Sequence, residues 1–138
     1  MNSPAYDIAQ KIAAEGLATF GGSTAWVVGV NTMLDNPDEF LAVTDVGGVP
    51  GDTISDVEFD SLWSVQIKAR AATRDAAVNK LDAITAAMNL LKNYSVVDGA
   101  VTINYIVQYR ATLPGFLAHD ERKRPIYVMT WSGMREWS

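Results

Sequence analysis

A run of strictly alternating residues that leads into a long amphipathic stretch, between Leu62 and Tyr94, most constrains the fold of this chain. Apolar or small residues occupy every second position of the run, as in a strand with one buried and one solvated face. The predicted buried face comprises Trp63, Val65, Ile67, Ala69 and Ala71, and the predicted solvated face comprises Ser64, Gln66, Lys68 and Arg70. We therefore expect this strand to form one wall of the hydrophobic core.

The stretch after this strand has the periodicity of an amphipathic helix. Its apolar residues recur at steps of three or four, which places them on one face of a helix; they are Val78, Leu81, Ile84, Met88 and Leu91. Thr73 is the expected N-cap, and Asp75 and Lys92 carry the charges that the helix dipole favours at the two ends. We expect the apolar face of this helix to lie on the buried face of the strand.

The other elements are marked by cap and turn residues. Ser3 and Pro4 predict the start of a first helix, which Gly16 ends as a left-handed C-cap. Turn signals separate further strands, which we expect over residues 24–30, 40–46, 101–110 and 126–133. The order α-β-β-β-α-β-β predicts an α+β fold, with two helices packed on one face of a mainly antiparallel sheet of about five strands. A chain of 138 residues is expected to form a single domain over residues 1–138.

The last predicted strand carries bulky side chains on both faces. Ile126 and Val128 share one face, and Tyr127, Met129 and Trp131 share the other. Both faces of such a strand have to be covered by other side chains. Either it takes a fully internal position in the sheet, or a neighbouring subunit covers its second face, because large exposed apolar patches usually mark interaction sites.

The composition excludes several classes of protein. A formal net charge of −5 argues against a dedicated nucleic-acid binder, because such binding depends on clustered Lys and Arg. The longest apolar runs are far shorter than the roughly 20 residues of a membrane-spanning helix, and the start of the chain lacks the regions of a secretory signal. The absence of cysteine excludes disulfides and thiolate metal sites and is typical of a reducing compartment.

The sequence offers little chemistry. His119 is the only histidine and stands beside Asp120, but neighbouring residues on a strand or turn point apart and do not relay a proton to each other. A solvated turn histidine is the interpretation we favour. With one imidazole and no thiol, no zinc site is expected, and the glycine pairs match no phosphate-binding loop. We expect no cofactor and no enzymatic activity.

Charged residues gather in a predicted long polar loop and in two short clusters. The loop spans residues 47–61, and loops of this length are often binding loops; it is either a solvated surface or a segment that orders against a partner. An acidic cluster covers Asp35 to Glu39 and a basic cluster covers Arg122 to Arg124. These clusters are either solvated, or they pair head-to-tail between copies of the chain.

Four stretches, in order along the chain, resemble one known family. They are Leu17-Ala18-Thr19 after the Gly-stopped helix, residues 36–50 with Asn36-Pro37-Asp38 and Gly47-Gly48, residues 65–76 with Val65-Gln66-Ile67-Lys68-Ala69-Arg70, and Gly115 to Arg124. Together they resemble the tail-terminator or minor capsid proteins of long-tailed bacteriophages. The chain departs from the family pattern at Ala18, where a glycine is expected, and at Ala118 and His119, where glycine and arginine are expected.

The resemblance implies a structural role in the virion. Such proteins form a hexameric ring on the last ring of tail tube protein, end tube polymerisation and present the joining surface to the head. The implied partners are other copies of the chain, the tail tube protein and a head completion or neck protein. No membrane and no specific nucleic acid is implied, although DNA passes through the ring. The implied locations are the head–tail interface of the virion and, during assembly, the host cytoplasm.

We expect the polar loop, the turn over residues 114–124 and the last strand to supply contacts between subunits or with neighbouring proteins. The candidate interface residues are Asp52, Asp56, Glu58, Asp60, Asp120, Glu121, Arg122, Arg124, Tyr127 and Trp131. Another head–tail neck or completion protein is an alternative within the same class. A small-molecule-binding or enzymatic α+β domain is an alternative of a different class, which aromatic-rich strands would suit and the lack of converging polar groups opposes.

Overall fold

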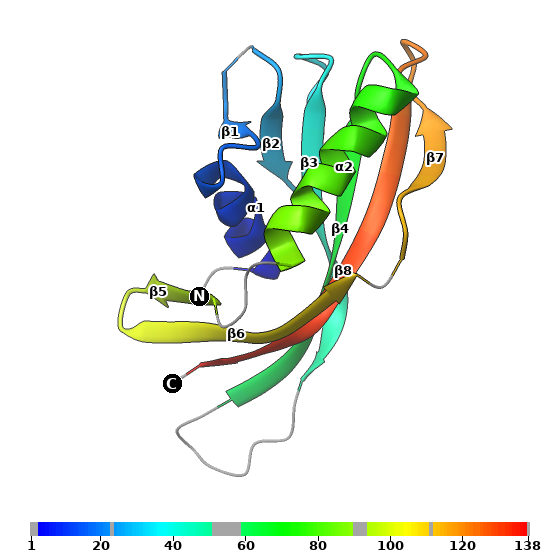
Figure 1. The fold of residues 1–138 in the computed structure, drawn as a ribbon. Coiled ribbons are helices and arrows are strands. Elements are labelled where there is room, and N and C mark those ends of the chain that lie inside the picture. Colours follow the sequence, from blue (N-terminus) through cyan, green and yellow to red (C-terminus); the bar gives the residue numbers. More distant parts are fainter. Residues whose placement is uncertain (1–2, 23, 51–58, 90–93, 111, 138) are drawn as a thin grey trace.

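In a computed structural model the chain folds into a curled, eight-stranded sheet that wraps around two helices (Figure 1). The structure describes residues 3–22, 24–50, 59–89, 94–110 and 112–137. The elements in chain order are α1 (Pro4–Ala14), β1 (Thr19–Phe20), β2 (Val27–Val30), β3 (Phe40–Pro50), β4 (Phe59–Arg70), α2 (Arg74–Asn89), β5 (Tyr94–Asp98), β6 (Val101–Arg110), β7 (Gly115–His119) and β8 (Pro125–Trp137).

The sheet is mixed. Its order is β1-β2-β3-β4-β8-β6-β5, and β7 pairs with β8 outside this path. β1 and β3 both pair with β2 in parallel, whereas the other pairs are antiparallel. The prediction of a mainly antiparallel sheet of about five strands is therefore wrong. The strands it missed, β1, β5 and β7, are short and lie at edges, where little burial imposes an alternating pattern on the sequence.

β8 lies inside the sheet and joins its two halves. One edge of β8 pairs with β4 along its whole length. The other edge is shared, because β7 pairs with residues 125–128 and β6 pairs with residues 131–137. The strand is longer than the predicted range of 126–133 because pairing on both edges continues to Trp137.

The helix ends follow the cap residues. Ser3 Oγ accepts a hydrogen bond from the Tyr6 amide at 3.3 Å, and Thr73 Oγ1 accepts one from the Ala76 amide at 3.3 Å, which confirms both predicted N-caps. α1 ends in a Schellman motif with Gly16 at a φ of +75°. There the Leu17 amide donates to the Ile12 carbonyl at 3.2 Å.

The core lies between the concave face of the sheet and the two helices. The face of β4 that the alternating pattern predicted to be buried is buried along its length, from Trp63 to Ala71. Leu81, Ile84 and Met88 of α2 pack in the same core. Ala77 is buried where the pattern predicted Val78, and the predicted Leu91 and Lys92 lie outside the described residues.

Part of the predicted polar loop is strand. β3 continues through Gly47–Pro50 and β4 starts at Phe59, so the two strands form a hairpin longer than predicted. A bulge between Asp45 and Gly48 absorbs the glycine pair without ending the strand. Residues 51–58 lie outside the described residues. Gly115–His119 likewise forms β7, where the sequence predicted a turn.

A polar pair lies inside this core. Asp7 on α1 is buried and accepts a hydrogen bond from the Tyr105 hydroxyl of β6. Burial, with the hydrogen bond to Asp7 as the next cause, raises the pKa of Tyr105 well above its ordinary value. The N-terminus of α1 is fixed from the sheet as well, because Asp45 Oδ1 accepts from the Ala5 amide at 2.9 Å.

Residues 31–39 connect the parallel strands β2 and β3 without a helix, and we call this segment the crossover. It runs over the convex face of the sheet, opposite the helices. A Cβ on Gly29 would point to that face and would meet Thr32 Cγ2 at 2.9 Å and Phe40 Cζ at 3.0 Å. Glycine at position 29 therefore allows the crossover to lie directly on β2. No helix in the described part of the chain is long and apolar enough to cross a membrane.

Candidate functional site

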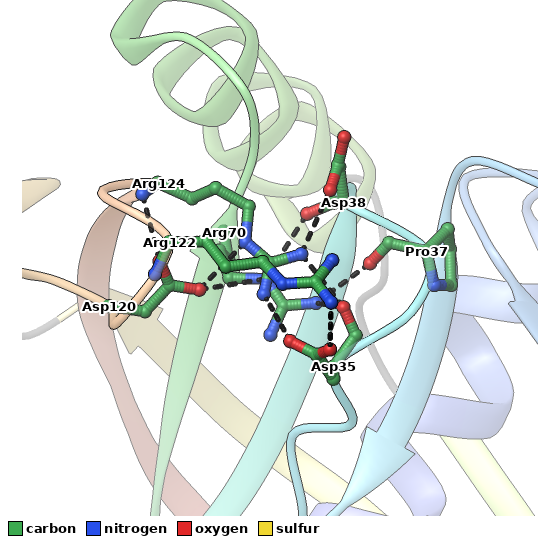
Figure 2. Close-up of polar contacts among 7 residues, drawn as sticks. All are labelled: Asp35, Pro37, Asp38, Arg70, Asp120, Arg122 and Arg124. Atoms are coloured by element: carbon green, nitrogen blue, oxygen red, sulfur yellow. Dashed lines mark hydrogen bonds and ion pairs between the residues drawn. The ribbon is translucent and has the colours of Figure 1, made fainter.

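Six charged side chains meet on the convex side of the sheet, near the start of β3 (Figure 2). They come from three segments that are far apart in sequence: the crossover, the last residue of β4, and the turn between β7 and β8. We call this group the arginine–aspartate cluster. Its members are Asp35, Asp38, Arg70, Asp120, Arg122 and Arg124.

Arg70 holds the backbone of the crossover. Its Nη2 donates to the carbonyls of Pro37 at 2.7 Å and Asp35 at 3.2 Å, and its Nε donates to the Asp38 carbonyl at 3.2 Å. The guanidinium also lies 5.7 Å from the centre of the Phe40 ring. An irregular segment on a sheet leaves buried carbonyls without helix or strand partners, and Arg70 supplies the donors.

The prediction that Arg70 belongs to a solvated face is wrong. Its side chain is only 3% exposed. The alternating pattern correctly separated the two faces of β4, but it contains no information on a distant loop that covers the second face. Burial of a charged group requires compensation by hydrogen bonds and opposite charge, and the crossover supplies both.

Arg124 joins the turn to the crossover and is almost completely buried, with 7% of its side chain exposed. Its two Nη groups bind Asp35 Oδ1 at 2.8 Å and Asp38 Oδ1 at 2.9 Å. Its Nε donates to Asp120 Oδ2 at 2.7 Å. Burial alone would lower the pKa of Arg124, but the hydrogen bonds to these three carboxylates raise it above its ordinary value.

Asp120 organises the turn itself. Its Oδ1 accepts from the amides of Arg122 at 3.0 Å and Arg124 at 2.8 Å, which is the Asx-type bonding that shapes turns. The turn places Lys123 at a φ of +63°. Burial would raise the pKa of Asp120, but the hydrogen bonds from the Arg124 backbone and side chain lower it below the ordinary value.

The two buried arginines repel each other. The pKa of Arg70 is lowered, first by burial and then by the charge of Arg124. Carboxylates from both sides offset this repulsion, and three arginines face three aspartates, so the formal charges of the cluster cancel. Arg122 lies at the solvated rim, where its Nη2 is 2.9 Å from Asp35 Oδ2; an exposed pair of this kind contributes only about 0–1 kcal/mol.

The structure pairs the acidic and basic clusters of the sequence within one chain. Asp35 and Asp38 bind Arg124, and Asp35 also binds Arg122. The opposite charges of these two clusters were visible in the sequence, from which we expected either solvated surface or pairing between copies of the chain. Arg70 carried no such signal, because it stands in an alternating strand where its neighbours Lys68 and Gln66 are also polar.

The structure places the other predicted interface residues at several separate positions. Asp52, Asp56, Glu58 and the side chain of Asp60 lie outside what the structure describes, and Glu121 is exposed on the turn. Tyr127 is half-buried, with the Phe116 ring edge-on at 5.6 Å. Trp131 is fully buried in the core, the internal position that was one of the two alternatives for β8. An interface role for these seven residues, and for Asp120, Arg122 and Arg124, remains a prediction.

The arginine–aspartate cluster holds three segments of the chain together, and its carboxylates are bound to its arginines. No group of three or more His, Asp or Glu side chains with metal-binding geometry occurs within residues 3–22, 24–50, 59–89, 94–110 and 112–137. His119 is exposed, with its ring 5.0 Å from the Phe116 ring. The neighbouring Asp120 carboxylate is directed toward Arg124 instead.

Apolar side chains are exposed at two edges of the sheet. Beside and on β7, Leu113 is 74% exposed, Phe116 54% and Leu117 49%. At the β1 edge, Phe20 is 48% exposed and its ring lies 6.2 Å from that of Tyr6. Figure 1 shows β1 and β7 on opposite sides of the molecule. Among the described strands, β1 pairs only with β2 and β7 only with β8, so each combines an open backbone edge with exposed apolar surface.

A protein-family model described as bacteriophage tail terminator protein matches residues 11–131. The match covers most of the chain and contains every residue of the arginine–aspartate cluster, the crossover and β7. No curated protein sequence matches the chain.

Proposed function

Because the chain belongs to the bacteriophage tail terminator family, we propose that it assembles into a hexameric ring that caps the tail tube and ends tube polymerisation. The family assigns a structural role in the phage tail, which makes the protein a component of the virion. The free face of the ring then forms the joining surface to the head, through a head completion or neck protein. The chain acts in this proposal as a structural protein, without a cofactor.

The observation that carries the proposal is the pair of apolar edge strands, β1 and β7, on opposite sides of the molecule. A ring needs two different surfaces on each subunit, because its contacts are head-to-tail. The β7 edge with Phe116 and Leu117 is one such surface, and the β1 edge with Phe20 is the other. Exposed edge strands readily pair with another chain, and apolar side chains beside them add burial to the backbone hydrogen bonds.

The charge distribution supports the same assembly. Asp35, Asp38, Arg122 and Arg124 are paired within the chain, so the ring in this proposal is held by apolar burial at the edges. A net charge of −5 also suits a ring through which DNA passes. Neutralising phosphates requires clustered cations, and a chain with net negative charge lets the DNA pass without holding it.

The experiment is a measurement of mass by light scattering over a concentration series, with and without purified tail tubes, followed by negative-stain imaging. The matched variants are F116S/L117S at the β7 edge and V97S on β5, where Val97 is 74% exposed. We expect the parent chain and V97S to form six-fold rings in solution or on tubes. We expect F116S/L117S to remain monomeric and to keep a cooperative thermal transition, although β7 loses the contact between Phe116 and Tyr127.

Two results would overturn this proposal. A chain that stays monomeric in the presence of tubes would exclude the ring, and rings that bind DNA-filled heads but never tails would favour the neck or completion protein instead. Rings formed equally well by F116S/L117S would exclude the β7 edge as the contact.

A further inference from the structure

β7 and the turn after it depend on few contacts for their position. We call residues 115–124 the β7 arm. Within the described residues β7 pairs with β8 alone, and the pairing is irregular between Phe116 and Ala118. Residues 116–119 are all exposed, and the Phe116 ring packs edge-on against Tyr127 of β8. Segments with so little burial open locally at a small free-energy cost.

The arginine–aspartate cluster fastens the far end of this arm. Arg124 is the last residue of the arm. It binds the crossover through Asp35 Oδ1, the Asp35 carbonyl at 2.7 Å and Asp38 Oδ1. Asp120 locks the turn to Arg124. The crossover is in turn held by Arg70 on β4. The arm is therefore attached to the centre of the sheet through charged groups as well as through strand pairing.

The fastening depends on the charge of its carboxylates. Arg70 and Arg124 are both buried and repel each other, and the carboxylates carry the negative charge that offsets the repulsion, whereas the carbonyls that the two arginines bind carry no formal charge. A buried cation that loses its partner is strongly destabilising. Asp35 and Asp38 are 56% and 53% exposed, so protons reach them from solvent.

We propose that the β7 arm is an acid-released element, which leaves the crossover when the cluster carboxylates lose their charge while the core of β3, β4, β8 and the helices stays folded. The charged groups that face Arg124 are Asp35 and Asp38 from the crossover, Arg70 from β4, and Asp120 with Arg122 from the turn. Protonation of the three aspartates leaves three guanidinium groups together, and the resulting repulsion drives the arm outward.

The cluster carboxylates do not hold the core, which contains the buried carboxylate of Asp7 instead. β4 pairs with β3 and β8 on its two edges, and its buried face packs on α2 through apolar side chains. Apolar burial is insensitive to the protonation of surface carboxylates. Release of the arm is thus expected at a higher pH than global unfolding, and it does not require the ring that we propose above.

The test is amide hydrogen exchange by mass spectrometry from pH 7 to pH 3, corrected for the intrinsic pH dependence of exchange. We expect peptides covering residues 115–124 to lose protection as the pH falls below about 4, because the hydrogen bonds from Arg124 lower the pKa of Asp120, while peptides covering residues 62–71 keep theirs. D38N removes one cluster charge at neutral pH and should raise exchange of the arm about tenfold, as expected for the loss of a charged hydrogen bond. D82N on the exposed side of α2 is the matched control and should change neither region.

Loss of protection in both regions at the same pH would overturn the proposal, because the arm would then open only with the whole fold. Unchanged exchange of the arm in D38N at neutral pH would overturn it as well. If D38N does not fold, the pH series on the parent chain decides alone. Because pairing of the β7 edge in a ring would itself protect the arm, both readouts are taken on samples that light scattering shows to be monomeric.

Discussion

Arg70 and Arg124, which lie on different segments and carry the same charge, share the carboxylate of Asp120. Asp120 Oδ2 is 2.7 Å from Arg124 Nε and 3.8 Å from Arg70 Nε. The short contact is a hydrogen bond, whereas the long one is purely electrostatic. Asp120 therefore serves three tasks, because it shapes its own turn, binds Arg124 and reduces the repulsion between the two buried guanidinium groups.

Replacing Asp120 by asparagine should lower the free energy of unfolding by about 2–3 kcal/mol, because a charged hydrogen bond is lost and two buried cations lose a counter-ion. The measurement is urea denaturation at pH 7, in parallel with D82N, which removes an exposed carboxylate and should change the free energy by less than about 0.5 kcal/mol. Equal midpoints for D120N and D82N would show that the Asp120 charge is not needed.

The stability of the protein should fall in acid. The pKa of Asp120 is lowered in the folded chain, so the stabilisation is fully present above its ordinary pKa of about 4 and is lost as the pH falls below that value. Denaturation midpoints between pH 3 and pH 7 measure the effect. D120N should show a flatter pH dependence than the parent chain, and parallel curves for the two proteins would contradict this assignment.

Gly29→Ala should destabilise the chain by about 1–3 kcal/mol, the usual cost of overpacking. The new methyl group would meet Thr32 and Phe40 at about 3 Å, and one of those atoms belongs to the backbone of the crossover. Gly115→Ala is the control, because the nearest atom to its Cβ would be 3.9 Å away. A thermal unfolding midpoint that drops equally in both variants would contradict the close approach at Gly29.

Lys123→Gly should stabilise the chain by about 0.5–1 kcal/mol. Lys123 is exposed and has a φ of +63°, a conformation that costs a residue with a Cβ roughly 1–2 kcal/mol. Glycine avoids this cost, but its greater flexibility in the unfolded chain offsets part of the gain in stability. Glu121→Gly in the same turn lacks that gain and should be neutral or destabilising. Chemical denaturation of the two variants side by side distinguishes them, and a destabilised K123G would contradict the expectation.

Tyr105→Phe should cost about 1–3 kcal/mol, since the buried Asp7 carboxylate loses a hydrogen bond. Because burial and Asp7 raise the pKa of Tyr105, the parent chain should also lose stability as the pH rises above about 10, the ordinary tyrosine value. Y105F lacks this contribution. Tyr6→Phe, which changes an exposed hydroxyl, is the control, and equal effects of the two substitutions would contradict a special role for the buried pair.

The sequence predicted the parts of the fold in which burial acts on one face of a regular element. β4 and α2 are examples, because each packs one face in the core and its pattern records that face. Cap residues such as Ser3, Gly16 and Thr73 act locally, and for that reason the sequence predicted the helix starts and the end of α1 well.

The remaining features depend on contacts between distant segments. β7 is exposed on both faces, so its adjacent Phe116 and Leu117 show no alternation and the strand was missed. The parallel pairing of β2 and β3 requires the crossover, whose path is set by Gly29 and by Arg70. No local pattern reports that Arg70 and Asp35 meet across 35 positions of the chain. The cluster was therefore visible in the sequence only as two patches of opposite charge.

The position of β8 determines when the sheet can be completed during synthesis. Among the described elements β8 comes last in the chain, yet it supplies the pairing edge for β4, β6 and β7. A ribosome that has released residues 1–124 has produced a β4 strand with one unpaired edge, a β5–β6 hairpin that is not joined to the rest of the sheet, and a β7 segment without its partner β8. Folding during synthesis therefore stops with the sheet in two separate parts, and these parts join only after residues 125–137 have been made. Until then the nascent chain exposes edges that favour aggregation.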